Sequence, residues 1–230
     1  MNKKLLGIIG GMGTQATAHF FERLHCLQDV KTEQDYLDVL LYSIPSTPDR
    51  TAFITGQSSN SPLEHLVKAA KTLEAAEVSC ITIPCVTSHY FYSDLTKAVK
   101  TPIINMLSET AGFVKMSGVK KVCLLATDGT VKGGTFQSVF ETSGIEMCVP
   151  PKEAQRDVMR IIYDIKCSTA IMPGTADELK NIAEDALCSG AEAVILGCTE
   201  LCLFPDLSTR SIVNTLEVLA VSALKACNRS

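Results

Sequence analysis

Short apolar runs alternate with segments of helical periodicity along the whole chain. Continuous runs such as LLGIIG, KVCLLA and AVILG are typical of strands that are covered on both faces of a parallel sheet. Between them, apolar residues recur three and four positions apart, as expected for helices with one buried face, at 63–73, 158–165 and 216–224. This alternation predicts an α/β protein with mostly parallel sheets. The predicted strands are residues 4–9, 37–42, 79–84, 102–104, 121–126, 146–149, 192–197 and 211–213.

The chain also repeats itself. AEVSCITIPCVTSHYF followed by TPIINMLSETA matches AEAVILGCTELCLF followed by RSIVNTLEVLA, and aligned positions are a nearly constant 109 to 116 residues apart. A fixed internal period indicates duplication. We therefore expect two pseudo-symmetric lobes, residues 1–100 and 101–213, with the last helix in 214–230 packing back on the first and an active site in the cleft between them. The aligned pairs are Gly10 with Ala126, Cys85 with Cys198, and Asn105 with Asn214.

Composition excludes several classes of protein. The 230 residues are 46% hydrophobic, which is enough to bury a core and excludes a disordered chain. A net charge of −4 without a basic stripe argues against nucleic acid as a partner. The sequence has no run of 18 apolar residues, so no membrane span is predicted. The start of the chain imitates a signal peptide, but its glycines and its internal counterpart KKVCLLATDGT indicate a strand instead.

Ten cysteines are the unusual feature of the composition. A long chain with regular apolar segments is not the short, loop-rich kind that depends on disulfides, so we expect reduced thiols in a cytoplasmic protein. No set of cysteines has structural-zinc spacing, and no metal is expected. Eight of the ten are interpreted as small apolar fillers, and among these eight Cys202 stands apart because it follows Cys198 by one helical turn.

Cys85 and Cys198 differ from the rest because the same cysteine recurs at the same point of both repeats. Each ends a predicted strand beside hydroxyl residues, and a helix that begins after each would lower the pKa of its thiol. Two thiols on opposite sides of a substrate suit one reaction: one removes a proton from a carbon and the other returns a proton to its opposite face. Such a reaction inverts a stereocentre without a cofactor.

Other candidates lie in loops that follow the predicted strands. Gly11 to Ala16 fits the G-x-G-x-x-A dinucleotide fingerprint, but the expected acid after the second strand is missing. A nicotinamide-dependent oxidoreductase, a loop that holds a small anion and a plain tight turn all remain open.

Four charged or titratable side chains each have a functional and a structural interpretation. Arg50 either binds a carboxylate through two hydrogen bonds or lies solvated on the surface. Lys166 is either a ligand-binding cation or an ordinary lysine at a helix C-terminus. His89 either assists Cys85 or is simply packed. Glu200 either orients and deprotonates Cys198 or is an acid in the first turn of a helix.

The sequence resembles the aspartate/glutamate racemase family, and its aspartate racemase branch in particular. The resemblance extends over nearly the whole chain and implies cofactor-independent racemisation of an acidic amino acid between two homologous lobes, in a homodimer. It implies that Cys85 and Cys198 are the two catalytic acid/base residues. It also implies that Arg50 and Lys166 hold the substrate carboxylates, with further contacts from Met12, Gly13, Thr87, Thr127, Thr130 and Thr199. The motifs that carry it are Gly10-Gly11-Met12-Gly13, Pro45 to Arg50, Pro84-Cys85-x-Thr87-x-His89, Leu125-Ala126-Thr127-x-Gly129-Thr130 and Gly197-Cys198-Thr199-Glu200.

Three residues depart from the family pattern. Thr14 replaces a proline, Val86 replaces an asparagine after the first cysteine, and Asn214 replaces an aspartate that opens the last helix. Val86 matters most, because it removes an amide expected to contact the substrate and is compatible with a less polar one. A maleate- or malonate-type isomerase or decarboxylase, and a non-enzymatic binder of a small dicarboxylate, therefore stay open as alternatives.

Overall fold

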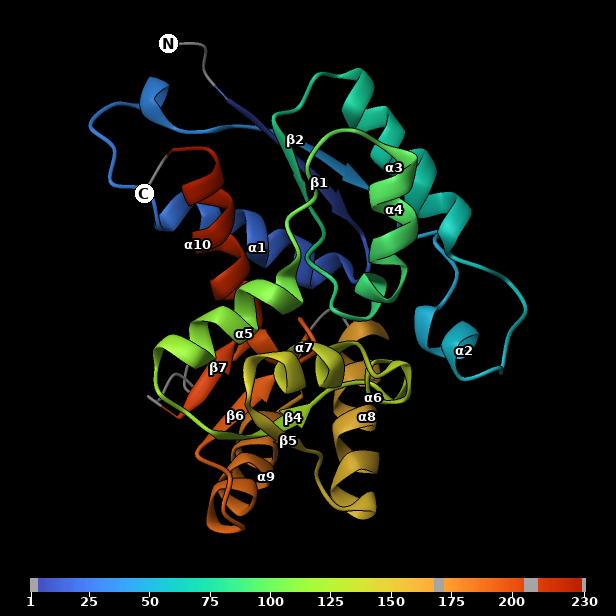
Figure 1. Cartoon of the computed structure of the whole chain (residues 1–230), viewed down its shortest axis with the longest axis vertical. Helices are drawn as coiled ribbons and strands as arrows, with labels where there is room; N and C mark the ends of the chain where they lie inside the picture. The colour runs from blue at the N-terminus through green and yellow to red at the C-terminus, as the bar shows by residue number, and fades with distance from the viewer. Residues whose placement is uncertain (1–3, 168–171, 205–210, 229–230) are drawn as a thin grey trace.

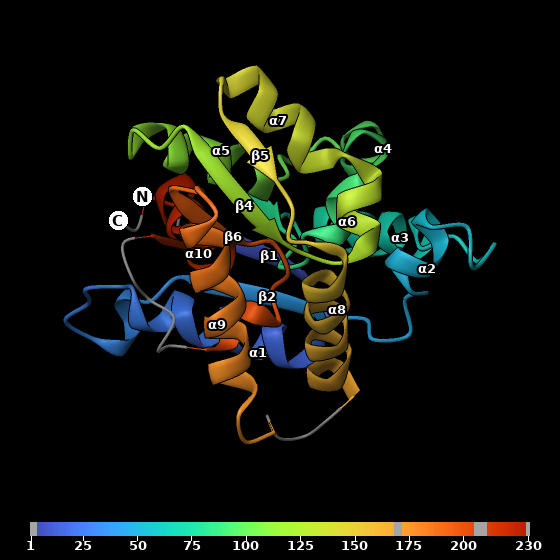
Figure 2. The same cartoon turned by 90° about the horizontal axis from the view of Figure 1, so that it is seen from below.

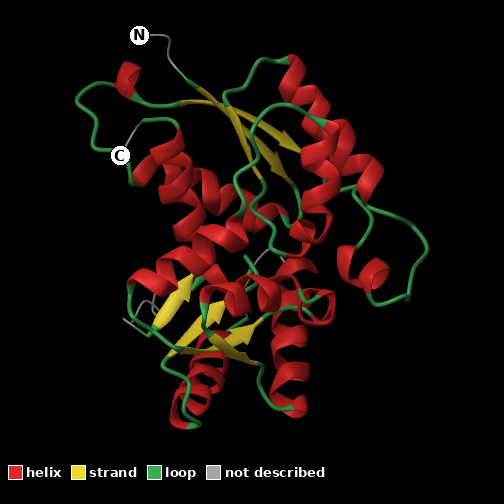
Figure 3. Ribbon diagram, in the orientation of Figure 1, coloured by secondary structure: helices red, strands yellow, loops and turns green. Residues whose placement is uncertain are grey.

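A computed structural model describes residues 4–167, 172–204 and 211–228 of the chain. Its strands form two separate parallel sheets, with orders β2-β1-β3 and β5-β4-β6-β7 (Figure 1). Figure 3 shows the two groups of strands at opposite ends of the molecule, with helices around and between them. The strands are β1 (Leu5–Gly10), β2 (Asp38–Ser43), β3 (Cys80–Thr82), β4 (Lys121–Leu125), β5 (Glu146–Cys148), β6 (Ala193–Leu196) and β7 (Ile212–Asn214).

The strand order confirms the internal duplication. In each half the first strand is central, the second lies at one edge and the third pairs on the other side. The fourth strand of the second half is β7, beside β6, and its counterpart predicted at 102–104 is reduced to a single bridge between Ile81 and Ile103. The other predicted strands are confirmed within one or two residues at each end. The two-lobed parallel α/β fold is therefore the one that the repeat predicts.

Helices cover both faces of each sheet. In the first sheet, a Cβ built on Gly7 would meet Leu73 of α3, while one built on Gly10 would meet Thr17 of α1, so α3 and α1 lie on opposite faces. Figure 2 shows α8 and α9 together on one side of the second sheet and α7 on the other. The periodic segments at 63–73, 158–165 and 216–224 are confirmed as parts of α3, α8 and α10. The helices are α1 (Thr14–Cys26), α2 (Arg50–Ile54), α3 (Leu63–Ala75), α4 (Tyr92–Ala98), α5 (Met106–Met116), α6 (Asp128–Gly133), α7 (Thr135–Ser143), α8 (Lys152–Cys167), α9 (Thr175–Cys188) and α10 (Thr215–Ala226), with 3₁₀ turns η1 (Glu33–Asp35), η2 (Thr87–Phe91) and η3 (Leu201–Leu203).

The two helices that follow the fourth strand position of each repeat begin in the same way. Asn105 caps α5 by accepting hydrogen bonds from the N–H groups of Leu107 and Ser108, and Asn214 caps α10 by accepting one from Glu217. The two helices pack against each other, and each also contacts one half of the molecule: α5 packs against α7, and α10 packs against α1 (Figure 1).

A bidentate ion pair fixes α10 to the first half. Nε and an Nη of Arg23 on α1 each lie 2.9 Å from a carboxylate oxygen of Glu217. Apolar side chains from both halves then join in one continuous buried cluster, which contains Leu6 and Phe20 as well as Leu124 and Leu219. The helix pair and the shared cluster thus tie the halves together, and the loops that follow β3 and β6 meet at the junction. None of the helices in the described ranges is long and apolar enough to cross a membrane.

Candidate active site

The two repeated cysteine loops contact each other where the sheets meet. Cys85 follows β3 and Cys198 follows β6, as parallel sheets require of groups at the carboxyl ends of their strands. The hydroxyl of Thr199, next to Cys198, donates a hydrogen bond of 3.3 Å to the carbonyl oxygen of Pro84, next to Cys85. Both cysteines are buried, with exposed fractions of 5% and 4%. The duplication therefore brings its two thiols to one place from opposite halves.

Glu200 joins this place to the glycine-rich loop of the first half. Its Oε2 lies 2.9 Å from Sγ of Cys198, and its Oε1 accepts a 3.0 Å hydrogen bond from the N–H of Gly13. The carboxyl group is buried. Burial first, and then the negative charge of Glu200, raise the pKa of the Cys198 thiol well above its ordinary value. The expectation that a following helix lowers this pKa is wrong for Cys198, because only the short 3₁₀ turn η3 follows it.

Two cations face the thiols. Arg50, the first residue of α2, is buried and donates hydrogen bonds to backbone carbonyl groups, among them that of Met12 at 3.4 Å. The solvated surface interpretation of Arg50 is therefore wrong. Burial opposes the charge of Lys166 on α8, yet the negative charges of Glu200 and Cys198 raise the pKa of its ammonium group above the ordinary value. Arg50 thus places a positive charge beside Cys85, and Lys166 interacts with both cysteines.

A supporting contact that the sequence did not reveal holds these cations. The hydroxyl of Tyr163 donates a 3.1 Å hydrogen bond to Oδ2 of Asp49, whose other oxygen caps α2 immediately before Arg50. Nζ of Lys166 lies 5.0 Å from the centre of the Tyr163 ring, within cation–π range. The available signal was the spacing of Tyr163 and Lys166, three residues apart on α8, which puts both on one face.

Three threonines from the two halves form a closed hydroxyl cluster. Oγ1 of Thr87 lies 3.1 Å from that of Thr127 and 3.0 Å from that of Thr130, and the last two are 3.1 Å apart. Thr127 also caps α6 by accepting the N–H of Thr130. All three are buried. The cluster thus joins the loop after Cys85 to the first turn of α6 in the second half.

The glycine-rich loop is a tight turn that the chain itself fills. Gly11 has a φ of +89°, and a Cβ there would lie 2.6 Å from the backbone nitrogen of Ile44. The N–H of Gly11 is taken by Oγ1 of Thr17. Because the chain's own loop occupies the space that a pyrophosphate needs, the structure does not favour the nicotinamide interpretation. No group of three or more metal-ligating side chains gathers within the described residues.

His89 supports the backbone and does not touch a thiol. Its Nδ1 lies 3.0 Å from the carbonyl oxygen of Cys85, and its Nε2 accepts the N–H of Met106 at 3.2 Å. This pattern requires a neutral ring with the proton on Nδ1. Burial accordingly lowers the pKa of His89. Of its two interpretations, the structural one fits.

Val86 and Asn214, two of the residues that depart from the family pattern, have structural roles. Val86 is buried and packs with the apolar side chains of the large core cluster. Asn214 caps α10, and its amide also donates to the carbonyl oxygen of Cys202. Neither side chain makes a polar contact with Cys85 or Cys198.

The remaining cysteines are not all core fillers. Cys202 is buried against Thr215 and backbone carbonyls, and burial raises its pKa to about 12, which makes it an inert structural thiol. Cys26, Cys167 and Cys188 are exposed, so the filler interpretation is wrong for these three. A small thiol on a helix surface carries no apolar periodicity by which its exposure could be predicted.

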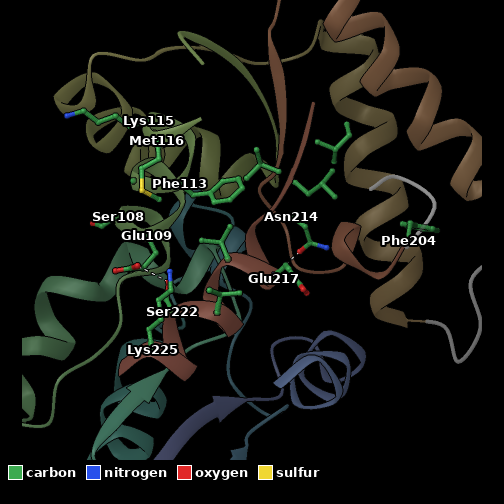
Figure 4. Close-up of a pocket in the computed structure, with 16 residues that line it drawn as sticks. Ser108, Glu109, Phe113, Lys115, Met116, Phe204, Asn214, Glu217, Ser222 and Lys225 are labelled. Carbon is green, nitrogen blue, oxygen red and sulfur yellow. Dashed lines mark hydrogen bonds between the residues drawn. The ribbon is translucent and has the colours of Figure 1, made fainter. Parts of the chain in front are cut away.

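A separate apolar groove of about 820 Å³ lies between α5 and α10 (Figure 4). Phe113 and Met116 form one wall, and Val218 and Val221 of α10 contribute to the other. It contains neither of the repeated cysteines nor the two cations beside them, so it is distinct from the candidate active site.

The fold and the paired thiols define a two-lobed α/β protein of the racemase class. A family model for Asp/Glu/hydantoin racemases matches residues 9–224, and the chain belongs to this family. The chain is 26% identical to a broad specificity amino-acid racemase of Bacillus subtilis, over 86% of each chain.

Solved structures agree with this family. An aspartate racemase of Picrophilus torridus has 28% identity and a TM-score of 0.83, with 99% of this chain and 95% of that chain covered. A glutamate racemase of Francisella tularensis has 18% identity and a TM-score of 0.62, covering 98% and 82%, and shares the fold. The chain is thus an enzyme of a racemase family, which makes it an isomerase.

Proposed function

We propose that the chain is a cofactor-independent racemase of acidic amino acids of the aspartate and glutamate type, with Cys85 and Cys198 as opposed acid/base catalysts. The observation that carries this proposal is the meeting of two duplicated thiols from opposite halves beside two cations, the buried Arg50 and the half-buried Lys166.

The chemical step uses only these groups. A thiolate on one side takes the α-hydrogen as a proton, and the electron pair of the broken C–H bond stays on the substrate, delocalised into its α-carboxylate. The thiol on the other side then gives its proton to the opposite face of the same carbon. The product is the enantiomer, and the two cysteines have exchanged protonation states.

Arg50 and Lys166 suit a substrate with two carboxylates. The Nε of Arg50 is buried without a hydrogen-bond partner among the described residues, so a donor is left for a ligand. A guanidinium binds a carboxylate through two parallel hydrogen bonds, and an ammonium group adds a second point of charge. One cation for each carboxylate explains a preference for acidic amino acids, while the Thr87 cluster supplies hydroxyls for further contacts.

Replacement of each thiol tests the proposal. In deuterated water, the wild type is expected to racemise L-aspartate or L-glutamate with deuterium entering the α-position. Cys85→Ala and Cys198→Ala are each expected to abolish racemisation. Cys202→Ala, a buried cysteine one turn away, is the matched control and should keep the turnover of its folded fraction.

The outcomes separate the alternatives. Full turnover in either active-site variant contradicts the two-thiol mechanism. Binding of a dicarboxylate without isotope exchange favours a non-enzymatic binder, and a product other than the enantiomer favours a maleate- or malonate-type isomerase or decarboxylase.

We further propose a homodimer in a reducing, cytoplasmic setting. The need for two free thiols supports the compartment, since a disulfide between them would remove both the acid and the base. Light scattering on the purified protein tests the dimer: a mass near twice the 24.8 kDa chain is expected, and a monomer at all concentrations contradicts it.

A further inference from the structure

The two repeated cysteine loops differ at one chemically important position. Two residues after each cysteine stands a polar side chain, Thr87 after Cys85 and Glu200 after Cys198. The hydroxyl of Thr87 turns to Thr127 and Thr130, whereas the carboxylate of Glu200 turns to the sulfur of its own cysteine at 2.9 Å. Duplication has therefore put two thiols in equivalent places with unequal neighbours.

The carboxylate of Glu200 is fixed in its place. Its Oε1 accepts the N–H of Gly13, and its side chain is buried. An ionised carboxylate only accepts hydrogen bonds, so a sulfur 2.9 Å from it must supply the proton. A thiolate at this position would set two negative charges against each other in a dry site. The geometry thus suits a protonated Cys198.

Cys85 faces a cation instead. After burial, which opposes it, the charge of Cys85 is the main cause that raises the pKa of the Arg50 guanidinium. Cys85 thus lies beside a positive charge where Cys198 lies beside a carboxylate, so the surroundings of the two thiols are unequal. Lys166 acts on both thiols, so it does not by itself separate them.

We propose that Glu200 is a positioning residue that holds Cys198 as the thiol in the substrate-free protein, which leaves Cys85 to act as the base. The protonation state of Cys198 rests on the contacts of Glu200. Its catalytic meaning rests on the proposed racemase function: the enantiomer whose α-hydrogen faces Cys85 is the one that reacts first. The charged and titratable groups around Cys198 are Glu200, Lys166 and Cys85.

Alkylation of the folded protein with iodoacetamide tests this assignment, because only a thiolate reacts rapidly. The rate at each cysteine is followed by peptide mass spectrometry across a pH range of about 6 to 10, which spans the ordinary thiol pKa. The exposed fractions of 5% for Cys85 and 4% for Cys198 are nearly equal, so access does not explain a difference. Near neutral pH we expect Cys198 to react at least about tenfold more slowly than Cys85, with the rate at Cys198 still rising at the alkaline end of this range.

Glu200→Gln removes the charge and keeps the shape. It is expected to raise the rate at Cys198 at least about tenfold and to leave Cys85 within about twofold. Adding Lys166→Met to this variant should slow Cys198 again, because Lys166 favours its thiolate. Cys123, a buried thiol on β4, reports folding, since it reacts only if the variant opens.

Two results overturn the inference: wild-type Cys198 reacting as fast as Cys85, or an unchanged rate at Cys198 in folded Glu200→Gln. If that variant unfolds, the wild-type comparison still decides. The measurement needs no turnover, so its failure is distinct from failure of the proposed function. A protein that racemises with equal alkylation rates would lose only the assignment of Glu200.

Discussion

We expect the small substitution Gly13→Ala to damage the site without unfolding the chain. The backbone of Gly13 has φ −95° and ψ 174°, an extended conformation that alanine adopts freely. A Cβ there would nevertheless lie 2.8 Å from Oε1 of Glu200 and 3.7 Å from Cγ of Lys166. Glycine is therefore needed at this position because it leaves room for the Glu200 carboxylate, and not because of the φ and ψ angles.

The size of the effect follows from the contact that is lost. Glu200 must move aside and give up the Gly13 N–H, and its contact with Cys198 shifts with it. A hydrogen bond to a charged group contributes about 1.5–3 kcal/mol, which corresponds to about a 10- to 150-fold fall in kcat/KM. Both enantiomers must lose the same factor, because two enantiomers have equal free energies and their equilibrium therefore fixes the ratio of the two kcat/KM values.

Chiral chromatography of the reaction in both directions measures this fall. Gly112→Ala is the matched control, because a Cβ there meets nothing within 4 Å. Alanine inside helix α5 should raise the free energy of unfolding by up to about 1 kcal/mol and leave turnover unchanged. A folded Gly13→Ala protein with kcat/KM within about twofold of the wild type would refute the reasoning that the position of Glu200 matters.

Two further changes probe the cation and the buried histidine. Arg50→Lys keeps the charge but loses the planar pair of donors, so KM for a dicarboxylate amino acid should rise at least about tenfold with a smaller change in kcat in steady-state assays; an unchanged KM would count against a carboxylate at Arg50. Burial lowers the pKa of His89, so the folded protein binds fewer protons at this residue than the unfolded chain does. The free energy of unfolding should therefore fall as the pH drops below about 6.5, by up to about 1.4 kcal/mol per pH unit. Urea unfolding of the wild type and His89→Asn should give curves that converge as the pH falls, and curves that stay parallel would contradict the neutral buried ring.

Local pattern and duplication made much of this molecule predictable. Continuous apolar runs revealed the parallel strands, and the repeat identified Cys85 and Cys198 because it placed the same residue at the same strand end twice. Contacts between distant segments were not predictable in this way. Asp49 and Tyr163 are 114 residues apart, and nothing local to either announces their hydrogen bond.

The chemistry of individual side chains was less visible than the fold. Sequence spacing left His89 with two interpretations, and only the placement of its ring nitrogens on two backbone groups chose between them. The sequence also favoured a lowered pKa for Cys198, whereas burial first and the negative charge of Glu200 second raise it, because both depend on how distant segments pack around the thiol.

In the proposed mechanism, two thiols from the duplicated halves flank one carbon. A crystal structure of the Cys85→Ser, Cys198→Ser double variant with bound L-aspartate or L-glutamate tests it most directly. The mechanism predicts the α-carbon between the two serine oxygens, each about 3–4 Å away on opposite faces, with the carboxylates at Arg50 and Lys166. Two results would contradict it: both serine side chains lying on the same face of the α-carbon, or the substrate bound in the groove between α5 and α10.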